Sequence, residues 1–369
     1  MLYYYPVRRK VLPHMGLTKK LFTSLTTSGH VGFRKAVSVS GIRAFIALFV
    51  VAAVGISTLQ VLKSYALTTS ASAACTAAAD TPGGPDPWGG CFPGQANVGV
   101  LSSTQLVNAD TASMTPPNAA LPSDNAGWYF YPAGNYIRVR SANAVIDGIS
   151  DSDGVYVPAG DSLTVKNSQT GAINDQGVSL TVENSTVNGG NQTTSPTISG
   201  QNVIVLSSNL YGGKDEINCG GSNCTVENSW LHDNYPAPAN GAHQQGFFAD
   251  GGTSYNLQHN SIFCAGNCTA DVSFIPNTNM SGVTINQNLL VASPSSSYCL
   301  YAGSDAPSKP GVINQVSVTN NVVQKGANGR CGQYGPVATF DTPNAAPGTN
   351  GYDNVWSGNT WDNGTVLNP

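Results

Sequence analysis

The chain has 369 residues, of which only 10% are Asp, Glu, Lys or Arg, while Gly and Pro number 41 and 22. Few charges and many turn-forming residues argue against an all-helical protein and against disorder driven by net charge. Every charged residue before Asp80 is Lys or Arg, nine in all, whereas the chain from Asp80 onward has 20 acidic and only seven basic residues. An acidic body argues against nucleic acid as a partner, because phosphates require a basic surface.

The N-terminal region has the pattern of an export signal. Residues 1–43 form a basic cytoplasmic leader, and residues 44–62 form an uncharged stretch of the length that crosses a bilayer as a helix, about 20 residues. An Ala-Ser-Ala sequence at 71–73 suits signal peptidase, so a cleaved signal and an uncleaved membrane anchor both stay open. We expect a linker at 63–90 and an extracytoplasmic domain at 91–369, anchored to the membrane or secreted.

Eight cysteines follow the apolar stretch, and an even number in an exported chain favours disulfides. Pairing neighbours in sequence predicts four bridges, which are Cys75–Cys91, Cys219–Cys224, Cys264–Cys268 and Cys299–Cys331. The alternative for Cys264, Cys268 and His259 is a zinc site, although no CxxC pair supports it.

A short pattern recurs through the body of the chain, and internal repeats decide the fold. Its copies are LTVKNSQT (163–170), LTVENSTV (180–187), VIVLSSNL (203–210), CTVENSWL (224–231), YNLQHNSI (255–262), VTINQNLL (283–290), VSVTNNVV (316–323) and NVWSGNTW (354–361). The first and third positions are mostly apolar, which predicts a half-buried strand. Asn or Ser at the sixth position suits a sharp bend, since Asn tolerates a left-handed backbone. The apolar eighth position begins another strand.

A third strand is expected before several of these copies. The candidates are DGVYV (153–157), QGVSL (176–180), DEINC (215–219), QGFFA (245–249) and ADVSF (270–274). Their central residues should form one inward column, made of Val155, Val178, Ile217, Phe247 and Val272. The sequence therefore predicts an all-β protein, a right-handed parallel β-helix of about eight three-strand coils, preceded by an N-terminal transmembrane or signal helix. A β-sandwich or propeller is the alternative.

The ladder of LTV-x-NS copies resembles the pectate-lyase-like superfamily of right-handed parallel β-helices. The sequences Cys91-Phe92-Pro93-Gly94 and Val145-Ile146-Asp147-Gly148 are similar to those of secreted bacterial right-handed β-helix repeat proteins. The resemblance covers roughly residues 91–364 and implies the fold. It implies no single activity, because the superfamily contains lyases, hydrolases, epimerases, adhesins and phage tailspikes.

A cluster of titratable residues in the middle coils is the candidate catalytic site. Strand alternation predicts that Glu216 and Asp271 share an outer face, two coil rises apart, with Gly246 leaving a gap between them. That spacing, about 9.6 Å, is near the roughly 6.5–9.5 Å of an inverting glycosidase pair. His243 with Lys214 or Asp215 would form a group that moves protons at near-neutral pH.

Other residues of these coils are given supporting roles. His232 is expected to point outward beside Tyr211, as a further catalytic candidate, and His259 is interpreted as structural. The residues expected to bind a substrate are Phe248, Trp230, Tyr235 and Gln245.

The sequence thus predicts a protein that binds or cleaves a polysaccharide or cell-surface glycan, with a glycosidase favoured over a Ca²⁺-dependent lyase. A hydrolase of this kind requires no cofactor, whereas a lyase could hold Ca²⁺ through its carboxylates. The alternative is a non-catalytic adhesin or structural solenoid at the cell surface. The only membrane contact expected is through the N-terminal helix.

Overall fold

The computed structural model describes most of the chain from residue 75 to residue 369. The residues that it does not describe are 1–74, 110–126, 132, 193, 236–242 and 305–308. The basic leader and the expected transmembrane stretch therefore lie outside the described residues. Within the described part every regular element is a strand, and no helix there has the length and apolar character needed to cross a bilayer.

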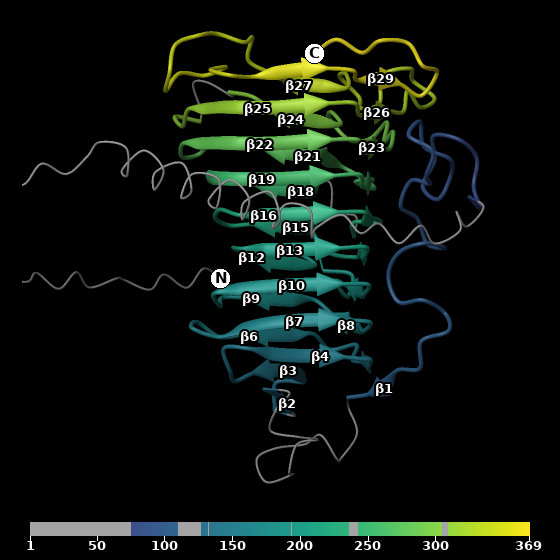
Figure 1. Cartoon of the computed structure of the whole chain (residues 1–369), viewed down its shortest axis with the longest axis vertical. Coiled ribbons are helices and arrows are strands. Elements are labelled where there is room, and N and C mark those ends of the chain that lie inside the picture. The colour runs from purple at the N-terminus through teal and green to yellow at the C-terminus, as the bar shows by residue number, and fades with distance from the viewer. Residues whose placement is uncertain (1–74, 110–126, 132, 193, 236–242, 305–308) are drawn as a thin grey trace, which may run out of the picture. The chain divides into compact units, whose positions relative to one another are not determined.

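The strands form three sheets, and from β3 onward successive strands of the chain enter the three sheets in rotation (Figure 1). Sheet 1 contains β4 (Ala144–Asp147), β7 (Ser162–Lys166), β10 (Ser179–Glu183), β13 (Val203–Leu206), β16 (Cys224–Glu227), β19 (Gly252–Gln258), β22 (Met280–Asn286), β25 (Ile313–Thr319) and β28 (Val355–Ser357). Sheet 2 contains β1 (Val107–Asn108), β5 (Ile149–Ser150), β8 (Gln169–Gly171), β11 (Thr186–Asn188), β14 (Asn209–Tyr211), β17 (Trp230–His232), β20 (Ser261–Ile262), β23 (Leu289–Leu290), β26 (Val322–Val323) and β29 (Thr360–Trp361).

Sheet 3 completes each coil. It contains β2 (Trp128–Tyr131), β3 (Tyr136–Val139), β6 (Val155–Val157), β9 (Ile173–Asp175), β12 (Ile198–Gly200), β15 (Asp215–Cys219), β18 (Gln244–Ala249), β21 (Cys268–Phe274), β24 (Leu300–Ala302) and β27 (Val337–Thr339). All neighbours within the sheets pair in parallel except β2 and β3, which are antiparallel. One strand from each sheet per coil, stacked in parallel, is the arrangement of a β-helix. Sheet 1 has nine strands in the described part, close to the expected eight coils.

The core consists of columns of apolar side chains that stack from coil to coil. The first and third positions of the repeat are buried in sheet 1, as Leu180 and Val182 illustrate, both with 0% exposure. In sheet 3, Ile217 pairs with Phe247, and Phe247 pairs with Val272, so the central part of the expected inward column is confirmed.

One member of that column was predicted wrongly. Val178 is 56% exposed and precedes β10 in a turn. The third strand of that coil is β9, and Ile173 takes the column position next to Val155. β12, whose Ile198 follows in the column, was not predicted at all. Both strands have three residues, too few to show an alternating pattern.

The bend between sheets 1 and 2 uses two positions of the repeat for two purposes. The left-handed backbone occurs at the fifth position, as in Asn184 with φ 46° and Asn228 with φ 50°. The sixth position, where we expected that conformation, instead points inward and is fully buried, as in Ser185 and Asn288. Asn suits the fifth position because its short side chain tolerates positive φ.

The sixth-position residues form a polar ladder inside the helix. Each accepts a hydrogen bond from the backbone N–H of its counterpart in the preceding coil, beginning with Ser185 Oγ and the N–H of Ser168 at 3.1 Å. The members are Ser168, Ser185, Ser208, Ser229, Asn260, Asn288, Asn321 and Asn359. The ladder pairs backbone N–H groups that the sharp bend would otherwise leave buried without a partner.

Four disulfides are present, and they join the pairs that the sequence predicts. Among the described cysteines none is free. The zinc alternative for Cys264 and Cys268 is wrong, because their sulfurs are bonded to each other and offer no thiolate ligand. Four bridges indicate that the domain matures in an oxidising, extracytoplasmic compartment.

Residues 75–109, which we call the N-terminal strap, lie along the outer face of sheet 2 (Figure 1). Phe92 is fully buried against Leu289 and Val322, near the C-terminal end of the sheet. Further down, the N–H of Gly99 donates to the Ser207 carbonyl at 2.9 Å. The strap ends in β1, which pairs with β5. The strap therefore covers part of the outer face of sheet 2.

Candidate functional site

A groove of about 950 Å³ lies between the N-terminal strap and the outer face of sheet 2. Residues of the strap between 95 and 103 form one wall, and side chains from β8, β11, β14 and β17 form the rest. This volume is near the upper end of the roughly 300–1,000 Å³ that ligand pockets occupy. The groove is therefore large enough for a segment of a polymer.

The floor of the groove is a row of outward side chains on four consecutive coils. Gln169 pairs with Thr186, Thr186 with Asn209, and Asn209 with Trp230. Three coil rises give this row a length of about 14 Å. The N–H of Val100 in the strap donates to Thr186 Oγ1 at 3.1 Å, which fixes the wall against the floor.

A second row carries the titratable residues of the groove. Tyr211 on β14 and His232 on β17 are paired in register, and their rings stack with centroids 5.4 Å apart. The indole of Trp230 stacks on the same imidazole at 3.5 Å. His232, expected to point outward beside Tyr211, does lie beside it, but these rings leave it only 7% exposed.

Hydrogen bonds fix the His232 ring as well. Its Nδ1 lies 2.8 Å from Asp233 Oδ2, and its Nε2 lies 2.7 Å from Asn209 Oδ1. The two contacts hold the imidazole ring in one orientation between β14 and the turn after β17. The hydrogen bond from His232 lowers the pKa of Asp233, whose side chain is 65% exposed and opens to the groove. The pair thus places an imidazole ring and an ionised carboxylate in the groove.

The expected catalytic pair lies elsewhere, and the prediction that it faces solvent is wrong. Glu216 and Asp271 both have 0% exposure. Glu216 Oε2 accepts from Thr197 Oγ1, and Asp271 Oδ1 accepts from the N–H of Cys264 at 2.8 Å. Gly246 leaves no gap, since a side chain there would collide with Ile262 and with the Asp271 carbonyl oxygen.

Burial raises the pKa of Glu216 and of Asp271 well above their ordinary values. Burial therefore favours the neutral form of both carboxyls in the folded protein. Each also has one oxygen without a hydrogen-bond partner. Strand alternation did turn these side chains away from the core column, but loops and neighbouring turns cover them. They cannot reach a substrate on the surface in this structure.

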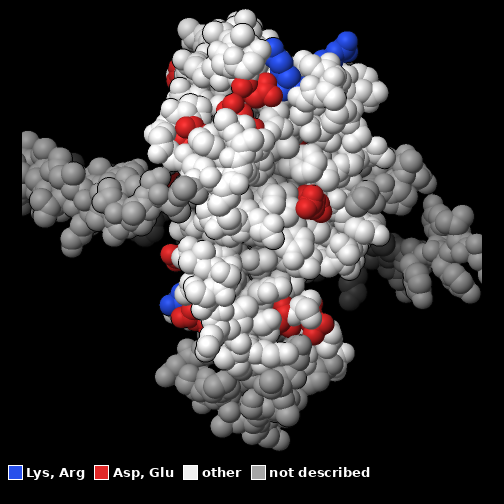
Figure 2. Space-filling model, turned by 90° about the vertical axis from the view of Figure 1, so that its right-hand side faces the viewer, with Lys and Arg blue, Asp and Glu red and all other residues white. Residues whose placement is uncertain are grey.

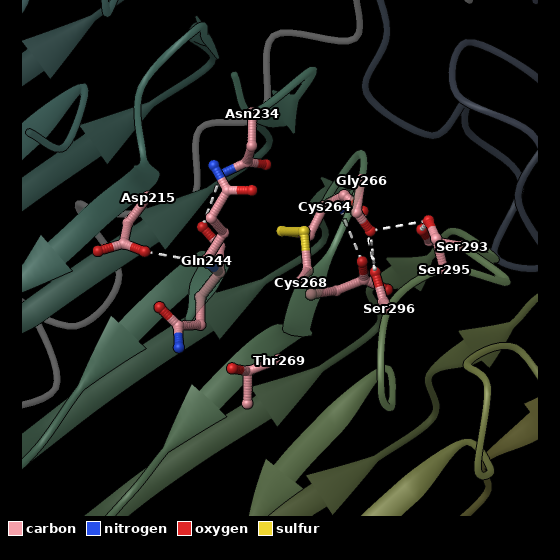
Figure 3. Close-up of a disulfide and its surroundings, with 12 residues drawn as sticks. Asp215, Asn234, Gln244, Cys264, Gly266, Cys268, Thr269, Ser293, Ser295 and Ser296 are labelled. Atoms are coloured by element: carbon pink, nitrogen blue, oxygen red, sulfur yellow. Dashed lines mark hydrogen bonds between the residues drawn. A yellow bond between two sulfur atoms is a disulfide. The ribbon is translucent and has the colours of Figure 1, made fainter. Parts of the chain in front are cut away.

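Asp215 belongs to a buried polar network between β15 and β18 (Figure 3). Its Oδ1 accepts from the N–H of Gln245 at 3.0 Å, and its Oδ2 lies 3.7 Å from Lys214 Nζ. Burial raises the Asp215 pKa to about 6, although Lys214 opposes the shift. Asn234 donates to the carbonyl oxygens of Lys214 and Gln245. Gln245 is thus a structural neighbour of Asp215 rather than a residue of the groove.

The remaining candidates are dispersed. His243 is exposed, and its Nδ1 lies 3.1 Å from Thr269 Oγ1 rather than against Lys214 or Asp215, so the expected pairing is wrong. Phe248 is half-buried on the outer face of sheet 3. Tyr235 is 37% exposed and follows Asp233 closely. Neither aromatic residue lines the groove.

His259 has the structural role that the sequence indicated. Its Nδ1 lies 2.8 Å from Asn228 Oδ1, and its Nε2 lies 3.0 Å from Asp86 Oδ2 in the strap. Trp88 and Phe92 of the strap pack against its ring. The residue therefore attaches the strap to the β-helix.

One group of potential metal ligands occurs among the described residues. It contains Asp271, Cys299 and Cys331, whose ligating atoms lie within 4.8 Å of one another. The two sulfurs form a disulfide and offer no thiolate, so this group does not fit a metal ion. No carboxylate cluster of the kind expected for Ca²⁺ accompanies the groove among the described residues.

The sequence analysis found Trp230 and His232, with Tyr211 and Asp233 beside His232, but missed the floor from Gln169 to Asn209 and the wall formed by the strap. A signal was present, because Gln169, Thr186, Asn209 and Trp230 are the seventh residues of four successive copies. The same column becomes apolar at Leu289 and Val322, where the strap covers it. The wall, in contrast, comes from a strap segment outside the repeats, and nothing in its sequence marks its position.

Comparison of the chain with models of protein families, with curated proteins and with solved structures finds no match.

Proposed function

We propose that this protein binds a polysaccharide in the groove between the N-terminal strap and sheet 2, in an extracytoplasmic compartment. The observation that carries the proposal is the make-up of the groove, in which a row of amide and hydroxyl side chains ends at the indole of Trp230. Aromatic rings bind the apolar faces of sugars, and amides and hydroxyls pair with sugar hydroxyls. The length of the row favours several sugar units of one chain.

The proposal also covers the superfamily that the domain resembles, its anchoring to the membrane and the residues that could take part in a reaction. The resemblance to pectate-lyase-like right-handed β-helices supports a polysaccharide as the ligand, and residues 44–62 would anchor the domain to the membrane if they are not removed. If a reaction accompanies binding, His232 and Asp233 are the titratable residues placed to take part, since both line the groove. Glu216 and Asp271 receive no role in such a reaction, because both are fully buried.

Replacing Trp230 with Ala is expected to weaken glycan binding at least tenfold, because the largest aromatic surface of the groove disappears. Tyr334→Ala is a matched control, since Tyr334 is 63% exposed and does not line the groove. A glycan array would identify the ligand, and calorimetry would measure affinity. Assays for new reducing ends and for unsaturated products would detect hydrolysis and elimination.

Two results would contradict the proposal. One is a protein that binds no glycan on the array while its circular dichroism shows a folded β-structure. The other is a glycan whose affinity is the same for the wild type and for Trp230→Ala. A non-catalytic adhesin would bind without turnover, so binding without either product keeps the proposal and excludes an enzyme acting on that glycan.

A further inference from the structure

The groove contains an unbalanced set of charges. Among the described residues that line it, none is Lys or Arg, and Asp233 is the one acidic residue. The hydrogen bond from His232 lowers the pKa of Asp233, so this carboxylate is ionised. An anionic ligand bound in the groove would therefore meet the negative charge of Asp233, and no lysine or arginine of the groove would neutralise the ligand's own negative charge.

The His232 ring does not offer a ligand a free ring nitrogen in place of a lysine or arginine. Its two nitrogens already contact Asp233 and Asn209, and the rings of Tyr211 and Trp230 stack on it. A ligand carboxylate would have to displace the Asp233 contact to reach it. A ligand carboxylate placed beside Asp233 would meet a like charge and no lysine or arginine with which to pair, which disfavours its binding.

The uncharged lining is well suited to hydroxyl groups. Gln169, Thr186 and Asn209 form the floor, and Gln95, Ser102 and Ser103 face them from the strap. Amides and hydroxyls offer donors and acceptors together, as sugar hydroxyls do. Figure 2, which views the side of the molecule with sheet 2 and the strap, shows a largely uncharged surface with scattered acidic residues and a few basic ones.

We infer that the groove binds an uncharged polysaccharide and rejects polyuronates and other acidic glycans. This inference rests on the proposed function and narrows it to one class of ligand. Selection occurs through charge, since the floor offers hydrogen bonds to either class but a carboxylate on each sugar would lie unpaired near Asp233. Binding is correspondingly insensitive to salt, because no ion pair forms between protein and ligand.

The first test compares neutral glycans with polyuronates on one array, at low and at high salt, using the wild type and Trp230→Ala. We expect the wild type to bind neutral glycans with an affinity that salt does not change, and we expect Trp230→Ala to bind them more weakly. Polyuronate binding that Trp230→Ala abolishes would overturn the inference and leave the proposed function standing. Failure to bind any glycan would overturn both.

The second test adds the missing charge. Gln169→Lys places an ammonium group on the floor, at an exposed position of β8, and is expected to raise polyuronate affinity at least tenfold. Thr181→Lys is the matched control, because Thr181 faces outward on β10 of sheet 1, away from the groove. The gain should disappear at high salt. An unchanged polyuronate affinity in a folded Gln169→Lys variant would contradict charge as the basis of selection.

Discussion

Replacing Asn288 with Ala is expected to lower the free energy of unfolding by about 3–5 kcal/mol. Asn288 is fully buried, and its side chain connects three coils. Its Oδ1 accepts from the N–H of Asn260 at 2.9 Å, and its Nδ2 donates to the carbonyl oxygen of Leu257 at 2.9 Å and to Asn321 Oδ1 at 3.0 Å. An alanine leaves the buried N–H of Asn260 without this acceptor and removes one hydrogen bond each from the Leu257 carbonyl and from Asn321 Oδ1.

Urea-induced unfolding, followed by circular dichroism, would measure this loss. Asn218→Ala is the matched control, since Asn218 lies on the outer face of sheet 3 and should change stability by no more than about 0.5 kcal/mol. Asn288→Ser should fall between the two, because a serine hydroxyl accepts the backbone N–H as it does at Ser229 in the ladder. A loss below about 1 kcal/mol for Asn288→Ala would contradict the ladder as a source of stability.

The second large effect concerns pH, and stability is expected to fall as the pH rises from about 4 to about 7. Burial raises the pKa of Glu216 and of Asp271 well above their ordinary values of 4.5 and 3.8, and raises that of Asp215 to about 6. The folded state therefore keeps protons that the unfolded state releases. Their contribution to stability is complete below the ordinary values and is lost as the pH rises toward the raised ones.

Each such group changes the ratio of folded to unfolded protein by about tenfold per pH unit within its window. Glu216→Gln and Asp271→Asn remove the titrating groups with little change of shape, and each should flatten the dependence of urea midpoints on pH. Asp353→Asn serves as the control, because Asp353 is exposed. Urea midpoints that stay constant or increase between pH 4 and pH 7 would show that these carboxyls are not held neutral in the folded protein.

The fold was largely predictable because a β-helix repeats its chemistry. Leu163, Leu180 and Val203 occupy equivalent positions of successive copies, and the structure pairs them in register. The short strand β12 could not be predicted, because three residues show no period. The roles of the fifth and sixth positions were confused, since Asn is common at both and sequence alone does not show which one points inward.

The candidate site was less predictable than the fold. Strand alternation gives the direction of a side chain from its own sheet, and it correctly turned Glu216 away from the core. It does not show what covers that side chain, and Thr197 from another coil contacts the carboxyl. The groove likewise depends on the strap, whose contact with Thr186 spans 86 residues of sequence. Contacts between the repeats and segments outside them leave no periodic signal.

The N-terminal strap has a consequence for the order in which the chain can assemble. Its carbonyl at Asp80 accepts from Gln324 Nε2, a residue 244 positions later, and Asp86 contacts His259, 173 positions later. The strap is synthesised before every coil of the β-helix, whereas these two partners follow it by more than 170 residues. The N-terminal part of the strap therefore cannot dock fully until the chain has been synthesised as far as Gln324, although every residue that lines the groove precedes residue 234.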